Sequence, residues 1–315
     1  MPRSRQLLPA LIGLVALLAG ACGSETDSAP GADSGSADTT RTVQHAMGNT
    51  DVSGTPQRVV VLDTGELDSV LALGVTPVGA VRADATSGLQ SYLAERTQDV
   101  AVVGTIGEPN LEAIASLQPD LILSNKVRHE ALYSQLSQIA PTVFAEKVGV
   151  AWKENFQLAA EALGKQAEAQ RILAAYEQNA KQVGEAFGDP SQLEVSMVRF
   201  MSGSIRLYGE GSFIGTVLHD AGFARPASQQ VDKTFVEVSQ EQINQAEGDI
   251  LFYAAYGNPD ETNQAEVTAG PLWQRLDVVS AGKAHEVSDD LWYLGIGPIA
   301  ADLILKDLTE YAPIS

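Results

Sequence analysis

Arg58-Val-Val-Val-Leu62 is a short apolar run, and it is followed by a segment of helical periodicity, Leu67-Asp-Ser-Val-Leu-Ala-Leu73, that stops at Gly74. Strands that are apolar throughout are typical of parallel sheets with both faces covered. Such runs alternate with amphipathic segments along the chain, which predicts an α/β fold. Further strands are expected at residues 78–82, 100–103, 120–124, 142–144, 194–200, 205–208, 249–253 and 284–287, and further helices at 111–117, 129–139, 212–221, 239–246 and 298–311.

A long helical stretch interrupts this alternation in the middle of the chain. Apolar residues recur at steps of three and four over residues 152–163 and again over 166–187. The second run would form a rod of about 33 Å, and Gly188-Asp-Pro190 ends it. We therefore expect two Rossmann-like lobes with parallel sheets, joined by one long rigid helix. The N-terminal α/β lobe, the helical connection and the C-terminal α/β lobe are expected at residues 43–150, 151–189 and 190–315.

Residues 1–22 are typical of a lipoprotein signal peptide. Arg3 and Arg5 precede an apolar run at 7–18, which would span only about 18 Å of a hydrocarbon core about 30 Å thick. Cys22 is the only cysteine, and it ends a Leu-Ala-Gly-Ala-Cys segment that resembles a lipobox, although alanine rather than leucine stands three positions before it. We expect lipid-modified Cys22 to hold the protein on the extracytoplasmic face of the cell membrane. A chance cysteine beside an ordinary cleavage site is the alternative.

Residues 23–42 contain small and polar residues without a large apolar side chain. Such a composition cannot bury a core, and it predicts a flexible tether with a mean reach of about 25 Å. A domain on this tether would stay near the membrane and remain free to reorient.

Charge and motifs argue against several classes of function. The chain holds 40 acidic and 20 basic residues, a formal net charge of −20. This sign argues against a nucleic-acid partner and against binding anionic lipid through a basic surface, and simple solubility accounts for it. No P-loop, nucleophile elbow or dinucleotide fingerprint occurs, so no catalytic residue is predicted. No set of residues has metal-ligand spacing, so a metal should arrive already chelated. The four histidines are expected to be surface or structural residues: His45, His129, His219 and His285.

Several short segments, each weak alone, match one family in their order and spacing. They are Pro56-Gln-Arg-Val-Val-Val-Leu62, Leu71-Ala-Leu-Gly-Val-Thr-Pro-Val-Gly79, Pro109-Asn-Leu-Glu-Ala-Ile114, Leu117-Gln-Pro-Asp-Leu-Ile-Leu123, Ile139-Ala-Pro-Thr-Val143, Arg206-Leu-Tyr-Gly209, Ser212-Phe-Ile-Gly215, Val238-Ser-Gln-Glu241 and Trp292 with Gly295-Ile-Gly-Pro298. In these segments the chain resembles the helical-backbone class of periplasmic-type binding proteins, which serve ferric siderophores, cobalamin and haem. Within that class it is most similar to the siderophore-binding members of Gram-positive bacteria.

The resemblance implies a monomeric substrate-binding lipoprotein on a Gram-positive cell surface. It would capture a ferric siderophore, of the hydroxamate type, and deliver it to the membrane permease of an ABC importer. The ferric siderophore would be the transported ligand rather than a cofactor. Binding of haem or cobalamin is the first alternative, followed by a surface ferric reductase or hydrolase and by a receptor that signals without transport. The rigid helix between the lobes implies only modest lobe closure on ligand binding.

The residues that would bind such a ligand follow from its chemistry. A ferric siderophore presents negatively polarised oxygens wrapped in methylene chain, and it calls for a few cationic donors and aromatic walls. Arginine suits this need, because its planar fork donates to several oxygens at once. A surface or ion-pair role is the alternative for each arginine, and core packing is the alternative for the tryptophan. The candidates are Arg82, Arg199, Arg206, Tyr208, Trp292 and Tyr293, with Phe200 as a further wall, while Trp152 and Trp273 are expected to be structural.

Docking to the permease calls for residues of another kind. The resemblance implies one glutamate on each lobe that pairs with arginines of the transporter, and the matching positions are Glu112 and Glu241. Both residues fall near predicted helix N-termini, where a carboxylate is stabilised by the helix dipole in any case. Such local stabilisation is the alternative to a docking role.

Overall fold

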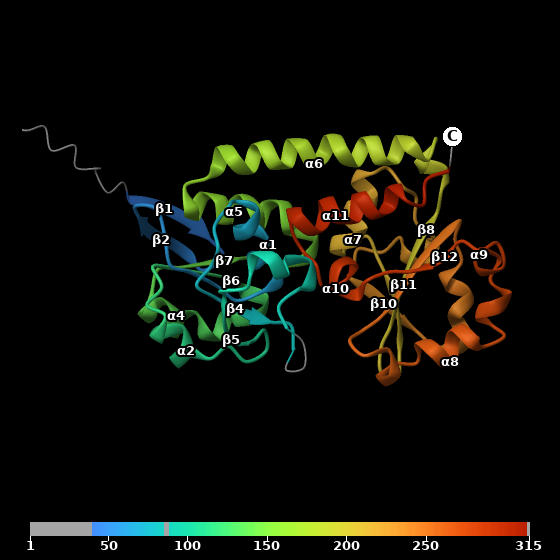
Figure 1. The fold of residues 1–315 in the computed structure, drawn as a ribbon, viewed down its shortest axis with the longest axis horizontal. Helices are drawn as coiled ribbons and strands as arrows, with labels where there is room; N and C mark the ends of the chain where they lie inside the picture. The colour runs from blue at the N-terminus through green and yellow to red at the C-terminus, as the bar shows by residue number, and fades with distance from the viewer. Residues whose placement is uncertain (1–39, 85–87, 314–315) are drawn as a thin grey trace, which may run out of the picture. The chain divides into compact units, whose positions relative to one another are not determined.

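The computed structural model describes residues 40–84 and 88–313, which belong to one compact unit (Figure 1). The expected signal peptide, Cys22 and most of the expected tether lie outside the described residues. None of the helices within residues 40–84 and 88–313 is both long enough and apolar enough to cross a membrane.

A β-hairpin opens the described part of the chain. Strand β1 (Thr40–His45) pairs antiparallel with β2 (Gly48–Ser53), so three residues of the expected tether belong to a strand. Arg41 fixes the hairpin, because its Nε and Nη2 donate to the carbonyl oxygen of Ala162 at 3.1 and 2.9 Å. Each strand buries only one valine, which is too little apolar periodicity to be recognised in the sequence.

The first sheet is parallel throughout, as predicted, with the strand order β5-β4-β3-β6-β7. Its strands are β3 (Val59–Val61), β4 (Gly79–Arg82), β5 (Ala101–Thr105), β6 (Leu121–Asn125) and β7 (Thr142–Ala145). Its helices are α1 (Thr64–Ala72), α2 (Leu111–Ser116), α3 (Lys126–His129) and α4 (Tyr133–Ile139). Helix α1 packs on one face, together with a helix of the connection, and α2 and α4 pack on the other. Both faces are therefore covered, which explains the continuous apolar strands.

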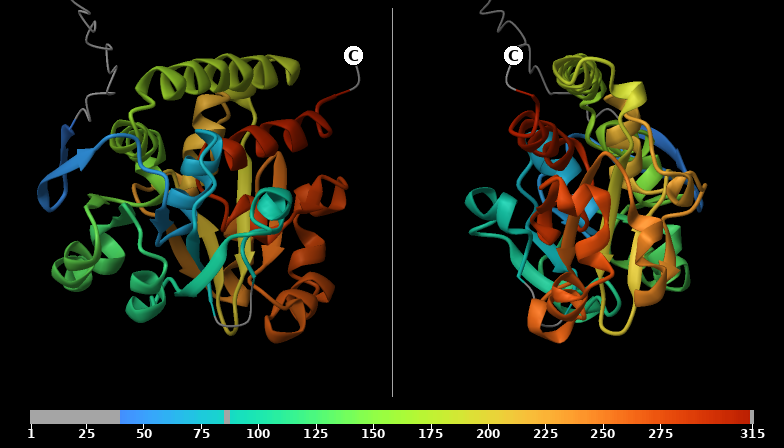
Figure 2. Two further views of the ribbon diagram at one scale, coloured as in Figure 1. Left: turned by 60° about the vertical axis from the view of Figure 1, so that its left-hand side comes forward. Right: turned by 90° about the vertical axis from the view of Figure 1, so that its right-hand side faces the viewer.

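The predicted helical connection is confirmed as α5 (Trp152–Leu163) and α6 (Gln166–Ala186). Gly164 separates the two helices with φ of 70°, a left-handed conformation that favours glycine and ends α5. Helix α6 passes over both sheets and contacts α5, α7 (Phe213–Asp220) and α11 (Pro298–Thr309). Figure 2 shows α6 and α11 side by side in both views.

The second sheet is mixed, and here the prediction of parallel sheets in both lobes was wrong. Its order is β10-β9-β8-β11-β12, with β9 antiparallel to both of its neighbours. Its strands are β8 (Val195–Phe200), β9 (Ile205–Tyr208), β10 (Phe235–Val238), β11 (Ile250–Ala255) and β12 (Ala284–Glu286). The loop at 201–204 is too short for the crossover that a parallel pair requires. The expected strand positions already implied a hairpin at this point.

Short helices complete the C-terminal lobe and the loops. The remaining α-helices are α8 (Gln264–Ala269), α9 (Asp277–Ser280) and α10 (Asp289–Trp292). The 3-10 helices are η1 (Ser91–Arg96), η2 (Glu130–Leu132), η3 (Gly149–Ala151), η4 (Pro190–Gln192), η5 (Ala227–Gln229), η6 (Gln240–Ala246), η7 (Pro259–Glu261) and η8 (Trp273–Arg275).

A buried carboxylate joins the two lobes away from the sheets. Asp68 of α1 accepts hydrogen bonds from the backbone N–H groups of Ile299 and Ala300, at 2.8 and 2.9 Å, in the first turn of α11. Tyr92 donates to the same carboxylate at 3.0 Å. Gly297 makes the approach possible, because a Cβ there would lie 2.5 Å from Asp68 Oδ1. Burial raises the pKa of Asp68 to about 7.

Candidate functional site

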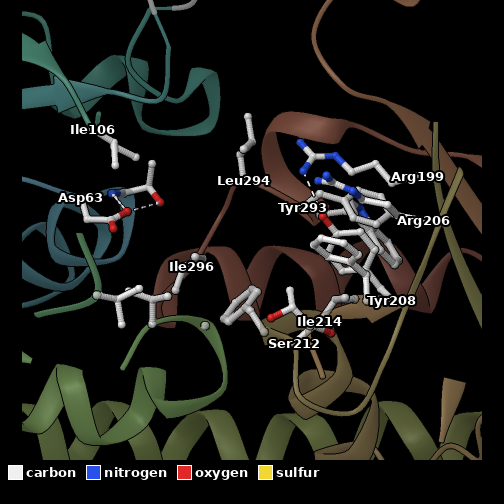
Figure 3. Close-up of a pocket in the computed structure, with 18 of the residues that line it drawn as sticks. Asp63, Ile106, Arg199, Arg206, Tyr208, Ser212, Ile214, Tyr293, Leu294 and Ile296 are labelled. Carbon is white, nitrogen blue, oxygen red and sulfur yellow. Dashed lines mark hydrogen bonds between the residues drawn. The ribbon is translucent and has the colours of Figure 1, made fainter. Parts of the chain in front are cut away.

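A cavity of about 440 Å³ lies between the two lobes, where the strands of the first sheet end (Figure 3). Asp63, Ile106 and Arg128 follow β3, β5 and β6, so they come from the carboxyl ends of three parallel strands. Crevices at the carboxyl ends of parallel strands are the usual binding sites of α/β proteins. The first lobe also lines the cavity with the start of α1, with α3 and with residues 148–149. The remaining lining residues come from β8, β9, the start of β10, α7, Trp292 at the end of α10 and the segment that joins α10 to α11.

Arg199 and Arg206 form the cationic wall of this cavity, because the strand register of the second sheet places them side by side. Arg199 on β8 lies directly opposite Arg206 on β9, and Glu237 on β10 lies opposite Arg206 on the other side. Residues in register across a sheet point to the same face, so the two guanidinium groups share a surface with Tyr208, two positions along β9. Two like charges this close would repel each other, and each has a carboxylate partner.

Arg199 is buried and held rigidly. Its Nε donates to Asp289 Oδ1 at 2.5 Å and its Nη2 donates to Asp289 Oδ2 at 2.6 Å, a bidentate geometry that fixes both groups. Its Nη1 donates to the Tyr208 hydroxyl at 3.0 Å. The guanidinium also lies 4.5 Å from the ring centre of Tyr256 and 5.4 Å from that of Tyr293. The position of Arg199 is therefore fixed before a ligand binds, and its Nε and Nη2 already donate to Asp289.

Arg206 is more accessible and less firmly paired. Its Nε donates to Glu237 Oε1 at 3.1 Å, and the Glu237 side chain is 51% exposed. An ion pair of this kind contributes about 0–1 kcal/mol, so an anionic ligand can replace Glu237 at little cost. The guanidinium lies 4.0 Å from the ring centre of Phe235, which supports the planar group from one side.

The opposite side of the cavity carries a buried acidic cluster. Asp63 Oδ2 accepts hydrogen bonds from Asn125 at 3.0 Å and from Arg128 Nε at 3.3 Å. Asn125 also donates to Glu66 Oε1 at 3.3 Å. Burial, together with the charge of Asp63, raises the pKa of Glu66 to about 8. Glu66 is therefore largely protonated at neutral pH, and Asp63 with Arg128 forms the charged pair that faces the cavity.

Apolar side chains line the cavity between these two charged walls. Figure 3 shows Leu294 and Ile296 between Asp63 on one side and Arg199, Arg206 and Tyr208 on the other. Further apolar and aromatic lining comes from Ile106, Val127, Val148, Phe213, Ile214 and Phe235. The site therefore suits a ligand with charged oxygens at its surface and methylene groups between them.

The structure brings most of the predicted ligand-binding residues together. Those that line the cavity are Arg199, Arg206, Tyr208, Trp292 and Tyr293. Trp292 is also fully buried, where it stacks near Phe252 and donates from Nε1 to Asp307 at 3.1 Å. Trp292 therefore has the core role that was its alternative as well as a place in the wall. The Tyr293 hydroxyl donates to the carbonyl oxygen of Val198 at 2.8 Å, which fixes its ring in the cavity floor.

Two predicted positions do not reach the cavity. The prediction of Phe200 as a cavity wall was wrong. Phe200 follows Arg199 on β8 and so points to the opposite face of the sheet, where it packs against Trp273. Arg82 ends β4 as expected but is not among the lining residues, and its Nε is buried without a hydrogen-bond partner within the described part of the chain. Trp152 and Trp273 are buried, as predicted for structural residues.

The sequence reasoning missed the partners that hold these groups. Asp63, Arg128, Phe235, Glu237 and Asp289 come from four separate segments, and only the tertiary structure pairs them. A partial signal existed for Asp63, since it follows an apolar strand and begins a helix, which is where α/β sites form. The register of β9 and β10 gives Glu237 and Phe235, but β10 itself was not recognised.

Glu112 and Glu241, the predicted docking residues, are both exposed in the first turns of α2 and η6. Helix α2 follows β5, and η6 follows β10, which runs parallel to β8 because both strands are antiparallel to β9. Both glutamates thus follow the carboxyl ends of strands. A hydrogen bond with Ser239 lowers the pKa of Glu241, so it stays charged.

The histidines do not form a metal site in the structure. No group of three or more histidine, cysteine, aspartate and glutamate residues suited to a metal ion occurs within residues 40–84 and 88–313. Ser124 Oγ and His129 Nδ1 lie 2.7 Å apart, like a nucleophile and its base. However, Ser124 is 1% exposed, and the other ring nitrogen of His129 donates to the carbonyl oxygen of Ile106 at 2.7 Å. This pair ties the loop after β5 to α3.

Several known proteins are similar to this chain in sequence and in fold. A family model described as periplasmic binding protein matches residues 59–290. The probable siderophore-binding lipoprotein YfiY of Bacillus subtilis is 40% identical over 284 residues, which are 86% of this chain and 87% of that protein. The Fe(3+)-citrate-binding protein YfmC of the same organism is 32% identical over 300 residues, 94% of this chain and 93% of that protein. The crystal structure of Staphylococcus aureus SirA complexed with staphyloferrin B has a TM-score of 0.78 at 33% identity and covers 86% of this chain and 98% of that chain.

Proposed function

This chain belongs to the periplasmic binding protein family, and we propose that it is the substrate-binding lipoprotein of an ABC importer that captures a ferric siderophore. The observation that carries this proposal is the cavity between the lobes, in which two arginines of the second sheet face an Asp–Arg pair of the first lobe across apolar walls. The names of its relatives, a siderophore-binding lipoprotein and an Fe(3+)-citrate-binding protein, support the same class of ligand. Binding without turnover is the activity expected of this family.

The ligand is proposed to be a ferric complex with carboxylate donors. The sequence predicted a hydroxamate ligand, and the names of the relatives do not specify that type. Three hydroxamates neutralise the charge of ferric iron, whereas citrate-type ligands leave the complex negatively charged. Each of the three guanidinium groups in the cavity has a carboxylate partner, but Glu237 is half exposed, and its displacement by the ligand would leave a net positive wall that favours a negatively charged complex. The ferric citrate ligand in the name of one relative supports this choice.

Arg206 and Arg128 are proposed to make the direct contacts, because they are more exposed than Arg199 and each meets its carboxylate through a single ion-pair contact. Glu237 is half exposed, and Arg128, whose own side chain is 44% exposed, meets Asp63 through a single contact of 3.3 Å. Arg199 instead keeps its bidentate partner, and each of its two Nη atoms carries a second N–H group besides the one that donates to Tyr208 or Asp289. The ligand would thus bind to groups from both lobes.

Delivery to the membrane completes the proposal. Cys22 carries the lipid anchor, residues 23–39 form the tether, and Glu112 and Glu241 dock the two lobes on the permease as a monomer. The relatives named as lipoproteins support the anchored, extracytoplasmic location.

The binding claim is tested by titrating the purified full-length protein with ferric citrate and following tryptophan fluorescence. Arg206→Ala should weaken binding tenfold or more, which corresponds to about 1.4 kcal/mol. Arg275→Ala is the matched control, because Arg275 is exposed and lies outside the cavity. Equal affinity of the two variants would remove Arg206 from the site.

A further inference from the structure

One acidic dipeptide contacts both the cavity and the opposite lobe. Asp289 holds Arg199 in the cavity wall, as described above. The next residue, Asp290, accepts two hydrogen bonds through Oδ2, from the backbone N–H of Ser91 at 2.6 Å and from the Ser91 hydroxyl at 2.7 Å. Ser91 begins η1 of the first lobe. A single peptide unit therefore connects the cationic wall to the other lobe.

The chain that follows is anchored to the first lobe at its far end as well. Asp68 holds the backbone of Ile299 and Ala300, and Tyr92, the neighbour of Ser91, donates to that carboxylate. Ile296 packs closely on Gly65 of α1, where a Cβ would lie 3.2 Å from its Cγ2. We call residues 289–300 the coupling segment.

The coupling segment also supplies part of the cavity wall. Tyr293, Leu294 and Ile296 line the cavity between the two anchored ends. The first lobe holds both ends of the segment that carries these residues, while the Tyr293 hydroxyl donates to Val198 of the second lobe. A change at Arg199 has a short path to η1, through its ion pair with Asp289, one peptide bond and the hydrogen bonds between Asp290 and Ser91.

We propose that Asp289 is a positioning residue for Arg199 and that the dipeptide Asp289–Asp290 couples the state of the cavity to the contact between the lobes. Loss of the bidentate Arg199–Asp289 pair makes the first turn of α10 more mobile and weakens the hydrogen bonds that Asp290 accepts from Ser91 of η1. A ligand that engages Arg199 changes the same contact. The ligand-dependent half of this inference rests on the proposed function, and the other half does not.

The test measures hydrogen–deuterium exchange of the backbone amides at 91–96 in the full-length protein without ligand. Arg199→Lys keeps the charge but cannot form the two-pronged pair, so exchange at 91–96 should rise about threefold or more, as for the loss of one net hydrogen bond. Asp289→Asn is the second variant and should act in the same direction. Asp290→Ala removes the acceptor itself and should give the largest rise in exchange at 91–96.

Arg206→Lys is the matched control, because Arg206 lies opposite Arg199 but its carboxylate partner, Glu237 on β10, lies outside the coupling segment. It should leave exchange at 91–96 unchanged. A rise in Asp290→Ala without a rise in Arg199→Lys and Asp289→Asn would overturn the coupling, and so would an Asp290→Ala variant that exchanges like the wild type.

A second arm adds ferric citrate. Binding should slow exchange at 91–96 in the wild type about threefold, and Asp290→Ala should abolish this response and weaken affinity about fivefold. Binding without any response at 91–96 would overturn the ligand-dependent half. Failure of ferric citrate and of other ferric siderophores to bind would instead refute the proposed function, while the ligand-free comparison still decides the coupling.

Discussion

Replacing Glu66 with glutamine should stabilise the protein at pH 8 and change its stability much less at pH 5. Glu66 is 8% exposed, and its Oε1 accepts a hydrogen bond from Asn125 at 3.3 Å. Burial and the nearby charge of Asp63 raise its pKa from 4.5 to about 8. Glutamine has the same shape, keeps the acceptor oxygen and cannot ionise.

The sign follows from proton linkage. Between pH 4.5 and about 8, Glu66 of the unfolded chain loses its proton while Glu66 of the folded protein keeps it, so the free energy of unfolding falls as the pH rises. The full difference in pKa would correspond to about 5 kcal/mol at pH 8. Relaxation and water penetration lower such penalties. We therefore expect Glu66→Gln to gain about 2–3 kcal/mol at pH 8 and less than about 1 kcal/mol at pH 5.

Urea denaturation of the wild type and the variant at several pH values between 5 and 8 measures this difference. Glu177→Gln is the control, because Glu177 is exposed on α6, and its effect should stay within about 0.5 kcal/mol at every pH. A Glu66→Gln variant whose advantage does not grow with pH would show that Glu66 is ionised in the folded protein.

Three further predictions concern other parts of the chain. Reversing both Glu112 and Glu241 to lysine should abolish siderophore uptake by cells and leave ligand affinity unchanged, and a loss of affinity would count against a docking role. The protein should lose stability as the pH falls below about 6.5, because burial lowers the pKa of His45 and its Nδ1 accepts from two backbone N–H groups. Thermal denaturation of His45→Asn should not show this loss. An equal loss in the variant would exclude His45 as its source. Cys22→Ser should move the protein from the membrane fraction to the medium, and unchanged fractionation would argue against lipidation.

The strands of the first sheet could be predicted because each is buried on both faces and therefore reads as an apolar run. The hairpin of β1 and β2 gave no such signal, since a contact with a distant residue, Arg41 to Ala162, fixes it. The mixed order of the second sheet depends on loop length rather than on apolar pattern. The short loop at 201–204, between the strands expected at 194–200 and 205–208, allows only an antiparallel pair.

The binding site was predictable in its chemistry and less so in its geometry. The need for arginines and aromatic walls led to Arg206, Tyr208 and Tyr293, which line the cavity. The carboxylates that hold these arginines, Asp289 and Glu237, could not be chosen from 40 acidic residues without the tertiary structure. Phe200 lies outside the site because side chains alternate along β8, which places it on the face opposite to Arg199.

The most direct test of the central claim is a titration of the full-length protein with a panel of ligands. The panel holds ferric citrate, a ferric trihydroxamate, a ferric catecholate, haem and cobalamin, and tryptophan fluorescence reports binding through Trp292 in the cavity wall. Saturable one-to-one binding of ferric citrate, tighter than that of the neutral trihydroxamate and of the ferric catecholate, is the expected result. Binding of haem or cobalamin alone, or of none of the five, would contradict a ferric-siderophore-binding function.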